Sequence, residues 1–252
     1  MKLSVVIITF NEERNIERCL LSVQLVADEI VVVDSYSKDK TFEICEKYNV
    51  HWIQNPFEGH IQQKNFALQQ ANNDWILSLD ADEALTIELS KSILVIKNEL
   101  NTKHKLFEMN RLTNYCGAWV KHCGWYPDTK VRLINRNFAK WGGVNPHDKL
   151  VGSTTETSGF LKGDILHYSY YTTEDHLKQI EYFSKIAAGE LLKQGNNVNV
   201  FTVYLKMMAQ FFKSFVLKLG ILDGKTGWQI SKLSAFATFR KYSILRELNE
   251  NR

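Results

Sequence analysis

The fold expected for this chain follows from residues 73–85, which read N-D-W-I-L-S-L-D-A-D-E-A-L. The apolar run from Trp75 to Leu79 is bounded by polar residues, as expected for a strand buried on both faces of a parallel sheet. Asp80, Asp82 and Glu83 follow at its carboxyl end, the edge at which open α/β sheets bind ligands. Because crowded carboxylates repel one another, they need a cation or a cationic side chain among them. The stretch predicts a divalent-metal site that clamps a diphosphate; the alternative is a solvated acidic turn that opens the next helix.

Strands alternate with helices before this stretch. Runs of β-branched and apolar residues predict three further strands, over Leu3–Phe10, Glu29–Val33 and Val50–Gln54. Asn11 is a predicted N-cap for the first helix, and another helix is predicted over Gly59–Ala71. Four such units predict an α/β fold with a parallel, doubly wound sheet. No glycine-rich loop follows the first strand, which argues against a dinucleotide fingerprint or a Walker-type phosphate loop.

The composition is that of an ordinary globular protein. The 252 residues are 44% hydrophobic and 23% charged, and the net charge of +3 is too small to indicate a nucleic-acid partner. The four cysteines show no paired spacing and are expected to be reduced thiols of a cytoplasmic protein. A zinc site at Cys116, His122 and Cys123 is an alternative, but no second ligand pair follows. No signal peptide is expected, because polar residues interrupt the first apolar run.

Three segments together resemble a known family. Ser4–Glu12 (S-V-V-I-I-T-F-N-E), Val31–Ser35 with the downstream Asp39 and Thr41, and Trp75–Glu83 match the family 2 inverting glycosyltransferases in order and spacing. The resemblance extends over nearly the whole chain and is strongest to the lipopolysaccharide core β-1,4-glucosyltransferase group. It implies the GT-A fold: a nucleotide-sugar-binding, mostly parallel central sheet flanked by helices, followed here by a C-terminal helical appendage.

The resemblance also implies roles for particular residues. Contacts to the nucleotide-sugar donor would come from Thr9, Asn11, Glu12, Asp34, Lys64 and Asp80. Asp82 would ligate a divalent cation, Mg²⁺ or Mn²⁺, and His167 would be a further metal ligand. Three simpler interpretations remain open: Asp34 as a turn cap, Lys64 as a surface lysine and His167 as a structural histidine at a strand end.

The middle of the chain is expected to bind the acceptor. Trp125 and Tyr126, in a loop predicted over Cys116–Asp128, could stack on a sugar or pack within the loop. Arg132, in a strand predicted over Lys130–Asn135, is a third acceptor-binding candidate. A loop predicted over Trp141–Asp148 (W-G-G-V-N-P-H-D) resembles the catalytic loop of the family. Asp148 stands where the family usually has Glu and is the predicted base, with His147 beside it as a positioning group or as an alternative base.

The last third is predicted to be helical. Helices are expected over Thr173–Leu192, over Val198–Leu222 and over Trp228–Leu248. Val198–Leu222 is strongly apolar, but its three lysines favour an interfacial helix over a membrane-spanning one. Packing on the catalytic domain or a dimer contact are the alternatives. The predicted domains are 1–195 (nucleotide-binding half 1–104, acceptor-binding half 105–195) and a membrane-associating appendage, 196–252.

The predicted activity is transfer of a hexose, glucose from UDP-glucose, onto a lipid-linked glycan such as lipopolysaccharide core. The reaction would be a metal-assisted single displacement, and the enzyme would lie in the cytoplasm on the inner leaflet of the inner membrane, with a homo-oligomer left open. A polyprenyl-phosphate glycosyltransferase and a non-catalytic glycan-binding or membrane-binding module are the alternatives. A nucleotidyltransferase would need a glycine-rich phosphate loop, and a haloacid-dehalogenase-type phosphatase would need Thr or Val where Ala84 stands.

Overall fold

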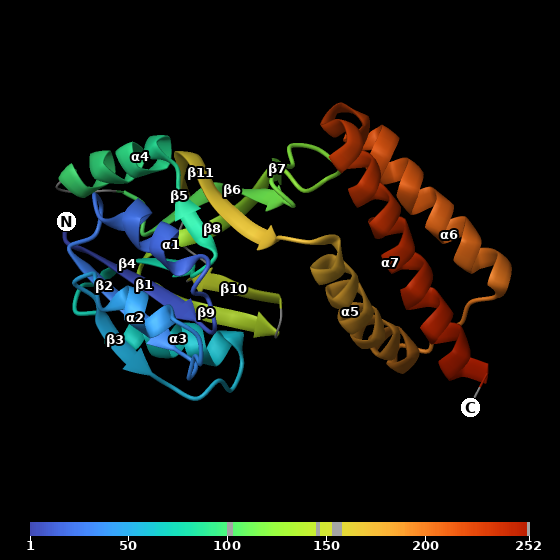
Figure 1. Ribbon diagram of the computed structural model, residues 1–252, viewed down its shortest axis with the longest axis horizontal. Helices are drawn as coiled ribbons and strands as arrows, with labels where there is room; N and C mark the ends of the chain where they lie inside the picture. Colours follow the sequence, from blue (N-terminus) through green and yellow to red (C-terminus); the bar gives the residue numbers. More distant parts are fainter. Residues whose placement is uncertain (100–102, 145–146, 153–157, 251–252) are drawn as a thin grey trace. The chain divides into compact units, whose positions relative to one another are not determined.

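The computed structural model describes residues 1–99, 103–144, 147–152 and 158–250. The chain forms two compact units, which Figure 1 shows coloured along the sequence. The first contains residues 1–111 and 128–168, and the second contains residues 112–127 and 169–252. This division differs from the boundary predicted at residue 195, because the helix that follows residue 172 packs with the C-terminal helices.

A central sheet organises the first unit (Figure 1). Its parallel part has the order β3-β2-β1-β4, formed by His51–Gln54, Glu29–Asp34, Leu3–Thr9 and Trp75–Asp80. The four strands predicted before residue 83 are therefore confirmed. The sheet then continues as β8 (Asp128–Asn135), β6 (Leu106–Tyr115), β11 (Ser158–Tyr170) and β5 (Glu83–Leu85). The sheet is mixed, because β4 pairs antiparallel with β8, β8 with β6, and β11 with β5.

Helices cover both faces of the parallel strands. They are α1 (Ile16–Val23), α2 (Thr41–Cys45), α3 (His60–Gln70) and α4 (Ile87–Asn98). Successive residues of β1 point to opposite faces. Val5 and Ile7 accordingly join a core cluster with residues of α1 and α4, whereas Val6 joins a second cluster with Ala67 and Leu68 of α3. The apolar run of β1 thus has a buried partner surface on each side.

The first helix begins later than predicted. Asn11 has a φ of 54°, outside the helical region, and α1 begins at Ile16 after Asn15. Hydrogen bonds to Asp39 and Thr41, just before α2 and at its start, explain the shift. The backbone N–H of Glu12 donates to Thr41 Oγ1 at 2.9 Å, and that of Glu13 donates to Asp39 Oδ2 at 2.9 Å. These bonds hold the segment as a loop at the sheet edge.

The predicted catalytic loop is a β-hairpin in its described part. Strand β9 (Ala139–Val144) pairs antiparallel with β10 (His147–Gly152), and Asn145 and Pro146 lie outside the described residues. The backbone of Trp141 is fixed to α3, since its N–H donates to Asn65 Oδ1 and its C=O accepts from Asn65 Nδ2, both at 2.9 Å. The glycine pair within the segment is typical of a loop, but the hydrogen bonds to Asn65 hold this part of the chain as strand β9.

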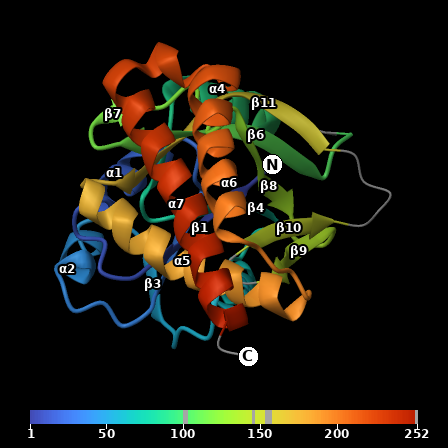
Figure 2. The same cartoon turned by 90° about the vertical axis from the view of Figure 1, so that its right-hand side faces the viewer.

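Three helices make up most of the second unit: α5 (Thr173–Lys193), α6 (Val200–Phe212) and α7 (Gly224–Glu250). Helix α7 packs against both α5 and α6, which run beside it in Figure 2. The apolar stretch predicted as one helix is broken into α6, a π-helical turn over Lys213–Leu217 and a 3-10 turn over Gly220–Asp223. A two-residue strand, β7 (Ala118–Trp119), pairs with the end of β6.

Candidate active site

The carboxyl ends of the parallel strands surround a cavity. Register aligns Thr9 with Asp34 and Ile8 with Asp80, so three chain segments end at the same edge. The cavity holds about 270 Å³. Its polar lining includes Thr9, Glu12, Ser35, Asp80, Asp82 and His167. Ligand binding at this edge is therefore supported by shape as well as by topology.

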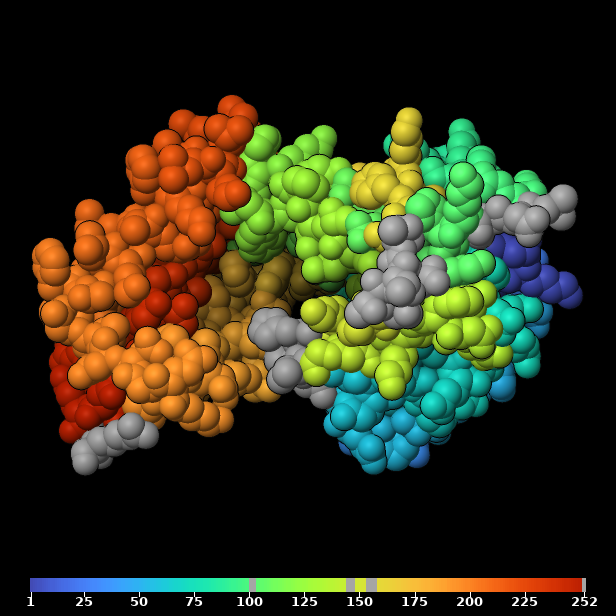
Figure 3. Space-filling model, turned by 180° about the vertical axis from the view of Figure 1, so that it is seen from behind, coloured from blue at the N-terminus to red at the C-terminus, as the bar shows by residue number. Residues whose placement is uncertain are grey.

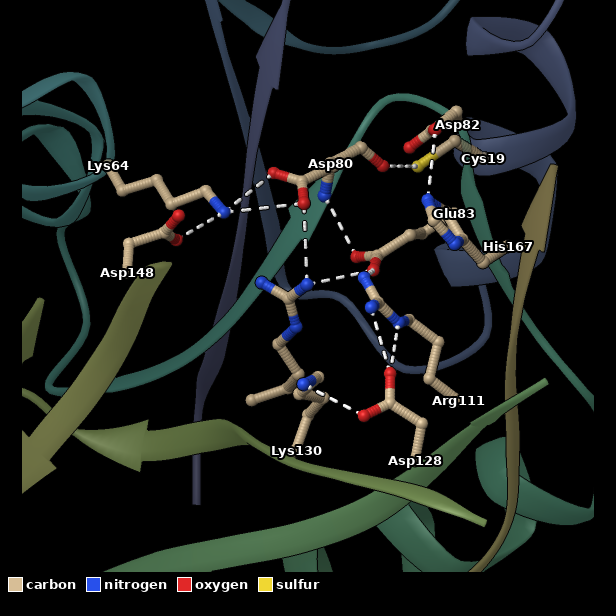
Figure 4. Close-up of polar contacts among 11 residues, drawn as sticks. Cys19, Lys64, Asp80, Asp82, Glu83, Arg111, Asp128, Lys130, Asp148 and His167 are labelled. Carbon is tan, nitrogen blue, oxygen red and sulfur yellow. Dashed lines mark hydrogen bonds and ion pairs between the residues drawn. The ribbon is translucent and has the colours of Figure 1, made fainter. Parts of the chain in front are cut away.

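Cationic side chains separate the clustered carboxylates. Asp80 lies 3.0 Å from Lys64 Nζ and 3.3 Å from Arg132 Nη2. Glu83 is buried, with Arg132 Nη2 at 2.8 Å and Arg111 Nη1 at 3.5 Å. Burial alone would raise the pKa of Asp80, but the charges of Lys64 and Arg132 outweigh it and hold the pKa well below its usual range. Figure 4 shows this network, in which Lys64 lies between Asp80 and Asp148.

Asp82 and His167 lie together in the cavity. His167 Nε2 is 3.2 Å from Asp82 Oδ2, although β11 carries the histidine and the aspartate follows β4 (Figure 4). Burial opposes the charged imidazole, yet the Asp82 carboxylate raises the pKa of His167 above its ordinary value. No group of three ligand-type side chains is found in the described ranges. One carboxylate and one imidazole fit a cation that takes its remaining ligands from a diphosphate and water.

The predicted donor contacts fall into two groups. Thr9 and Glu12 line the cavity, and burial, reinforced by the charges of Asp82, Asp39 and Asp80, raises the pKa of Glu12 to about 7. Asn11 and Asp34 are absent from the cavity lining. Asn11 Oδ1 accepts from the N–H of Lys38 at 2.8 Å, and the buried Asp34 accepts from the N–H of Ser37 at 2.8 Å.

Sequence reasoning missed several side chains of this cavity. They are Ser35, Phe57, His60 and Gln63. Gln63 is buried and donates to Ser35 Oγ at 3.0 Å. Ser35 could have been found from its place directly after the second strand, but Gln63 lies in the first turn of α3 and has no such local signal.

A second cavity, of about 550 Å³, lies beside the first and shares Asp80 with it. Its lining includes Lys64, Asp80, Arg132, Trp141, Asp148 and Lys149. Asp148 Oδ2 is 2.9 Å from Lys64 Nζ, so one buried lysine joins the predicted base to Asp80, a carboxylate of the first cavity. The backbone of His147 is in β10, and its side chain lies outside what the structure describes.

The aromatic acceptor candidates belong to the second unit. Trp125 packs edge-on against Tyr115, with ring centroids 5.8 Å apart, and its ring is tilted against that of Tyr170 at 5.7 Å. It borders a core cluster that includes Ile180 and Ile230. Tyr126 is half-buried beside it. Packing within the unit accounts for the position of Trp125.

Comparison with known proteins identifies the family. The family model described as "Glycosyl transferase family 2" matches residues 4–99. An uncharacterised glycosyltransferase of Rickettsia typhi is 31% identical over 256 residues, which cover 98% of this chain and 88% of the relative. The chain belongs to glycosyltransferase family 2. This glycosyltransferase is also 23% identical to LpsC, a lipopolysaccharide core biosynthesis glycosyltransferase of Rhizobium meliloti. The match covers 97% of this chain and 94% of LpsC.

Solved structures are also similar to this glycosyltransferase. The crystal structure of S. aureus TarS 1–349 in complex with UDP-GlcNAc matches all of this chain and 91% of that one, at 17% identity and a TM-score of 0.49. Family membership and the mixed sheet with its four parallel strands confirm the predicted GT-A fold and the predicted enzyme class. A non-catalytic module, the alternative considered from the sequence, is thereby set aside.

Proposed function

We propose that this glycosyltransferase moves a hexose, glucose from UDP-glucose, onto a lipid-linked glycan acceptor by inverting single displacement. Membership of family 2 supports the nucleotide-sugar chemistry. The similarity to LpsC, whose name refers to lipopolysaccharide core biosynthesis, supports a lipopolysaccharide-type acceptor.

The pair of cavities that share Asp80 is the observation that carries the proposal. An inverting transfer needs the donor on one side of the reacting carbon and a base near the incoming hydroxyl on the other. The first cavity contains the carboxylate and histidine side chains suited to a nucleoside diphosphate and its cation. The second contains Asp148, which would accept the proton of the acceptor hydroxyl as the new bond forms.

Asp82 and His167 would hold the divalent cation. A cation bound there would neutralise charge on the departing diphosphate. Lys64, between Asp80 and Asp148, would keep the two carboxylates of the reaction centre in fixed positions. Glu12, whose pKa is raised to about 7, would border the diphosphate with less repulsion than a carboxyl group of ordinary pKa.

Calorimetric titration of UDP tests the donor site. In Mn²⁺ we expect saturable binding that excess chelator weakens, because the cation joins Asp82 to the diphosphate. Asp82→Ala should lower the affinity in Mn²⁺ at least about tenfold, the size expected when a metal site loses a ligand or its support.

Asp74→Ala is the matched control, since Asp74 is an exposed carboxylate at the other end of β4. Equal affinity of the parent protein with and without chelator would remove the metal from the proposal. Absence of UDP binding under both conditions would remove the uridine donor.

We also propose that α6 and the turns after it bind the inner-leaflet surface, as would suit a lipid-linked acceptor. Among the described residues, Val200–Leu217 is long and apolar enough to cross a bilayer, with a mean hydropathy of 1.3, and only 11% of it is buried. Figure 3 shows α6, in orange, on an outer surface of the second unit. Exposed apolar side chains such as Phe201, Leu217 and Leu222 occur among exposed lysines at 206, 213, 218 and 225. This mixture favours an interfacial position, with the lysines near anionic head groups.

Vesicle flotation tests the membrane proposal. The full chain should float with vesicles containing phosphatidylglycerol and less with neutral ones. The double variant Phe201→Ser/Leu217→Ser should float at least about tenfold less, because each side chain contributes roughly 1.5–3 kcal/mol when it is fully buried in an apolar phase. Leu25→Ser, at a residue of the first unit that is 74% exposed, is the control. Unchanged flotation of the double variant would exclude this surface.

A further inference from the structure

Two residues that line the second cavity have buried N–H groups without a hydrogen-bond partner among the described residues. They are Nε and Nη1 of Arg132 and Nε1 of Trp141. Both side chains are almost fully buried, with 3% and 4% of the residue exposed. A buried donor left without a partner is destabilising, so such groups indicate a ligand atom that accepts from them.

The unpartnered groups are close to one another. The guanidinium carbon of Arg132 lies 5.4 Å from the centre of the Trp141 ring, and Lys64 Nζ lies 4.4 Å from the same ring. Arginine and indole N–H groups donate only. Phosphate and ionised carboxylate groups only accept hydrogen bonds, whereas a sugar hydroxyl adds a donor of its own that would need a further acceptor.

Cationic side chains line the second cavity together with carboxylates. The lining has five cationic side chains, from Lys64, Arg111, Lys130, Arg132 and Lys149, and three carboxylates, from Asp80, Glu108 and Asp148. Glu83 and Asp128, which are outside the lining, pair with the two arginines and with Lys130, so they balance the two remaining positive charges of the lining. Lys149 is exposed at the rim, and no ion pair is found for it within the part of the chain that the structure describes.

We propose that the second cavity receives an acceptor sugar that carries an anionic substituent, a phosphate or a carboxylate. Arg132 and Trp141 would bind the anionic oxygens, Lys149 would attract the charge from the rim, and the reacting hydroxyl would lie against Asp148. This inference rests on the proposed function, because it names the class of acceptor used at the same site.

Binding of small sugars to the full-length protein, saturated with UDP and Mn²⁺, tests the inference. The probes are glucose 6-phosphate, glucuronate and glucose, titrated by calorimetry or ligand-observed NMR. We expect the better of the two anionic sugars to bind at least about tenfold more tightly than glucose, the effect of one charge-assisted hydrogen bond. Whichever of the two binds more tightly identifies phosphate or carboxylate as the preferred group.

Three variants and one control variant assign the residues. Lys149→Gln should weaken the anionic sugars about two- to fivefold and leave glucose and UDP unchanged, as expected for an exposed charge. Lys140→Gln, at an exposed lysine of β9 outside the cavity lining, should change nothing. Arg132→Lys should lower the ratio of the affinity for the anionic sugars to the affinity for glucose about tenfold. Trp141→Phe keeps the aromatic packing while removing one N–H. It should also weaken the anionic sugars, and it replaces Arg132→Lys as the test if that variant fails to fold.

Failure of this inference and failure of the proposed function give different experimental results. Equal affinity for the three sugars in protein that binds UDP would overturn the inference and leave the proposed function standing. Loss of anionic-sugar binding on saturation with UDP would also overturn it, because the N–H groups of Arg132 would then belong to the leaving diphosphate. Lack of UDP binding would count against the donor site itself.

Discussion

Asp148→Asn should abolish most sugar transfer while UDP binds with unchanged affinity. A positioned general base contributes about 10²- to 10⁴-fold to the rate, and an amide cannot take the proton of the acceptor hydroxyl. The fold should survive, because the amide oxygen introduced at this position can still accept from Lys64, whose Nζ lies 2.9 Å from the present carboxylate. The measurement is release of UDP from UDP-glucose with and without lipopolysaccharide core acceptor, beside calorimetry of UDP.

Glu108→Gln is the matched control for this variant, because Glu108 lines the same cavity but accepts instead from Ser158 Oγ at 2.8 Å. Its transfer rate should stay within a few-fold of the parent. If Asp148→Asn keeps its turnover, the base is elsewhere. His147, its neighbour in β10, would be the next candidate, with His147→Gln as the variant to measure.

Lys64→Met should lower the free energy of unfolding by about 3–5 kcal/mol, the usual result of removing one partner from a buried ion pair. Lys64 is only 4% exposed, and its ammonium lies within 3.0 Å of both Asp80 and Asp148. The variant would leave these two carboxylates without their shared cation. Urea unfolding followed by circular dichroism measures the loss.

The same variant should show a distinct pH dependence. The folded-state pKa of Asp80 is depressed, despite burial, chiefly by Lys64, so its contribution is present above the ordinary pKa of 3.8 and is lost as the pH falls towards the folded value. The destabilisation by Lys64→Met should therefore be at its full size from neutral pH down to about 4 and shrink only as the pH falls below the ordinary pKa of 3.8. Lys91→Met, at an exposed lysine of α4, is the control. A loss no larger than that of the control would show that Arg132 alone compensates Asp80.

Much of the parallel part of the sheet and its helices could be predicted from local patterns. A run such as Leu3–Thr9 is apolar enough to require burial on both faces, and its alternating residues do meet helices on each side. Once four such strands are parallel, register alone brings Thr9, Asp34 and Asp80 to one edge. The same patterns placed α3, α5 and α7 within a few residues of their observed bounds.

Local patterns failed where distant partners decide the conformation. Asn11 has the chemistry of an N-cap, but Thr41 and Asp39 hold the next residues in a loop. The segment around Trp141 has loop-forming glycines, but Asn65 of α3 fixes it as a strand. In both cases hydrogen bonds across more than twenty residues outweighed local propensity.

The chain's own order of residues was enough to predict the α/β fold, the family and the acidic edge at Asp80 and Asp82, because these depend on hydrophobic periodicity and on short motifs. Tertiary structure alone decided which charges meet. Lys64 comes from a helix, Arg132 from an antiparallel strand and His167 from the last strand of the sheet, yet they pair with Asp80, Glu83 and Asp82. Ion pairs depend on distance in space and on burial, neither of which is encoded in sequence spacing. The folded chain thus separates one acidic cluster into a candidate metal pair and a buried charge network between two cavities.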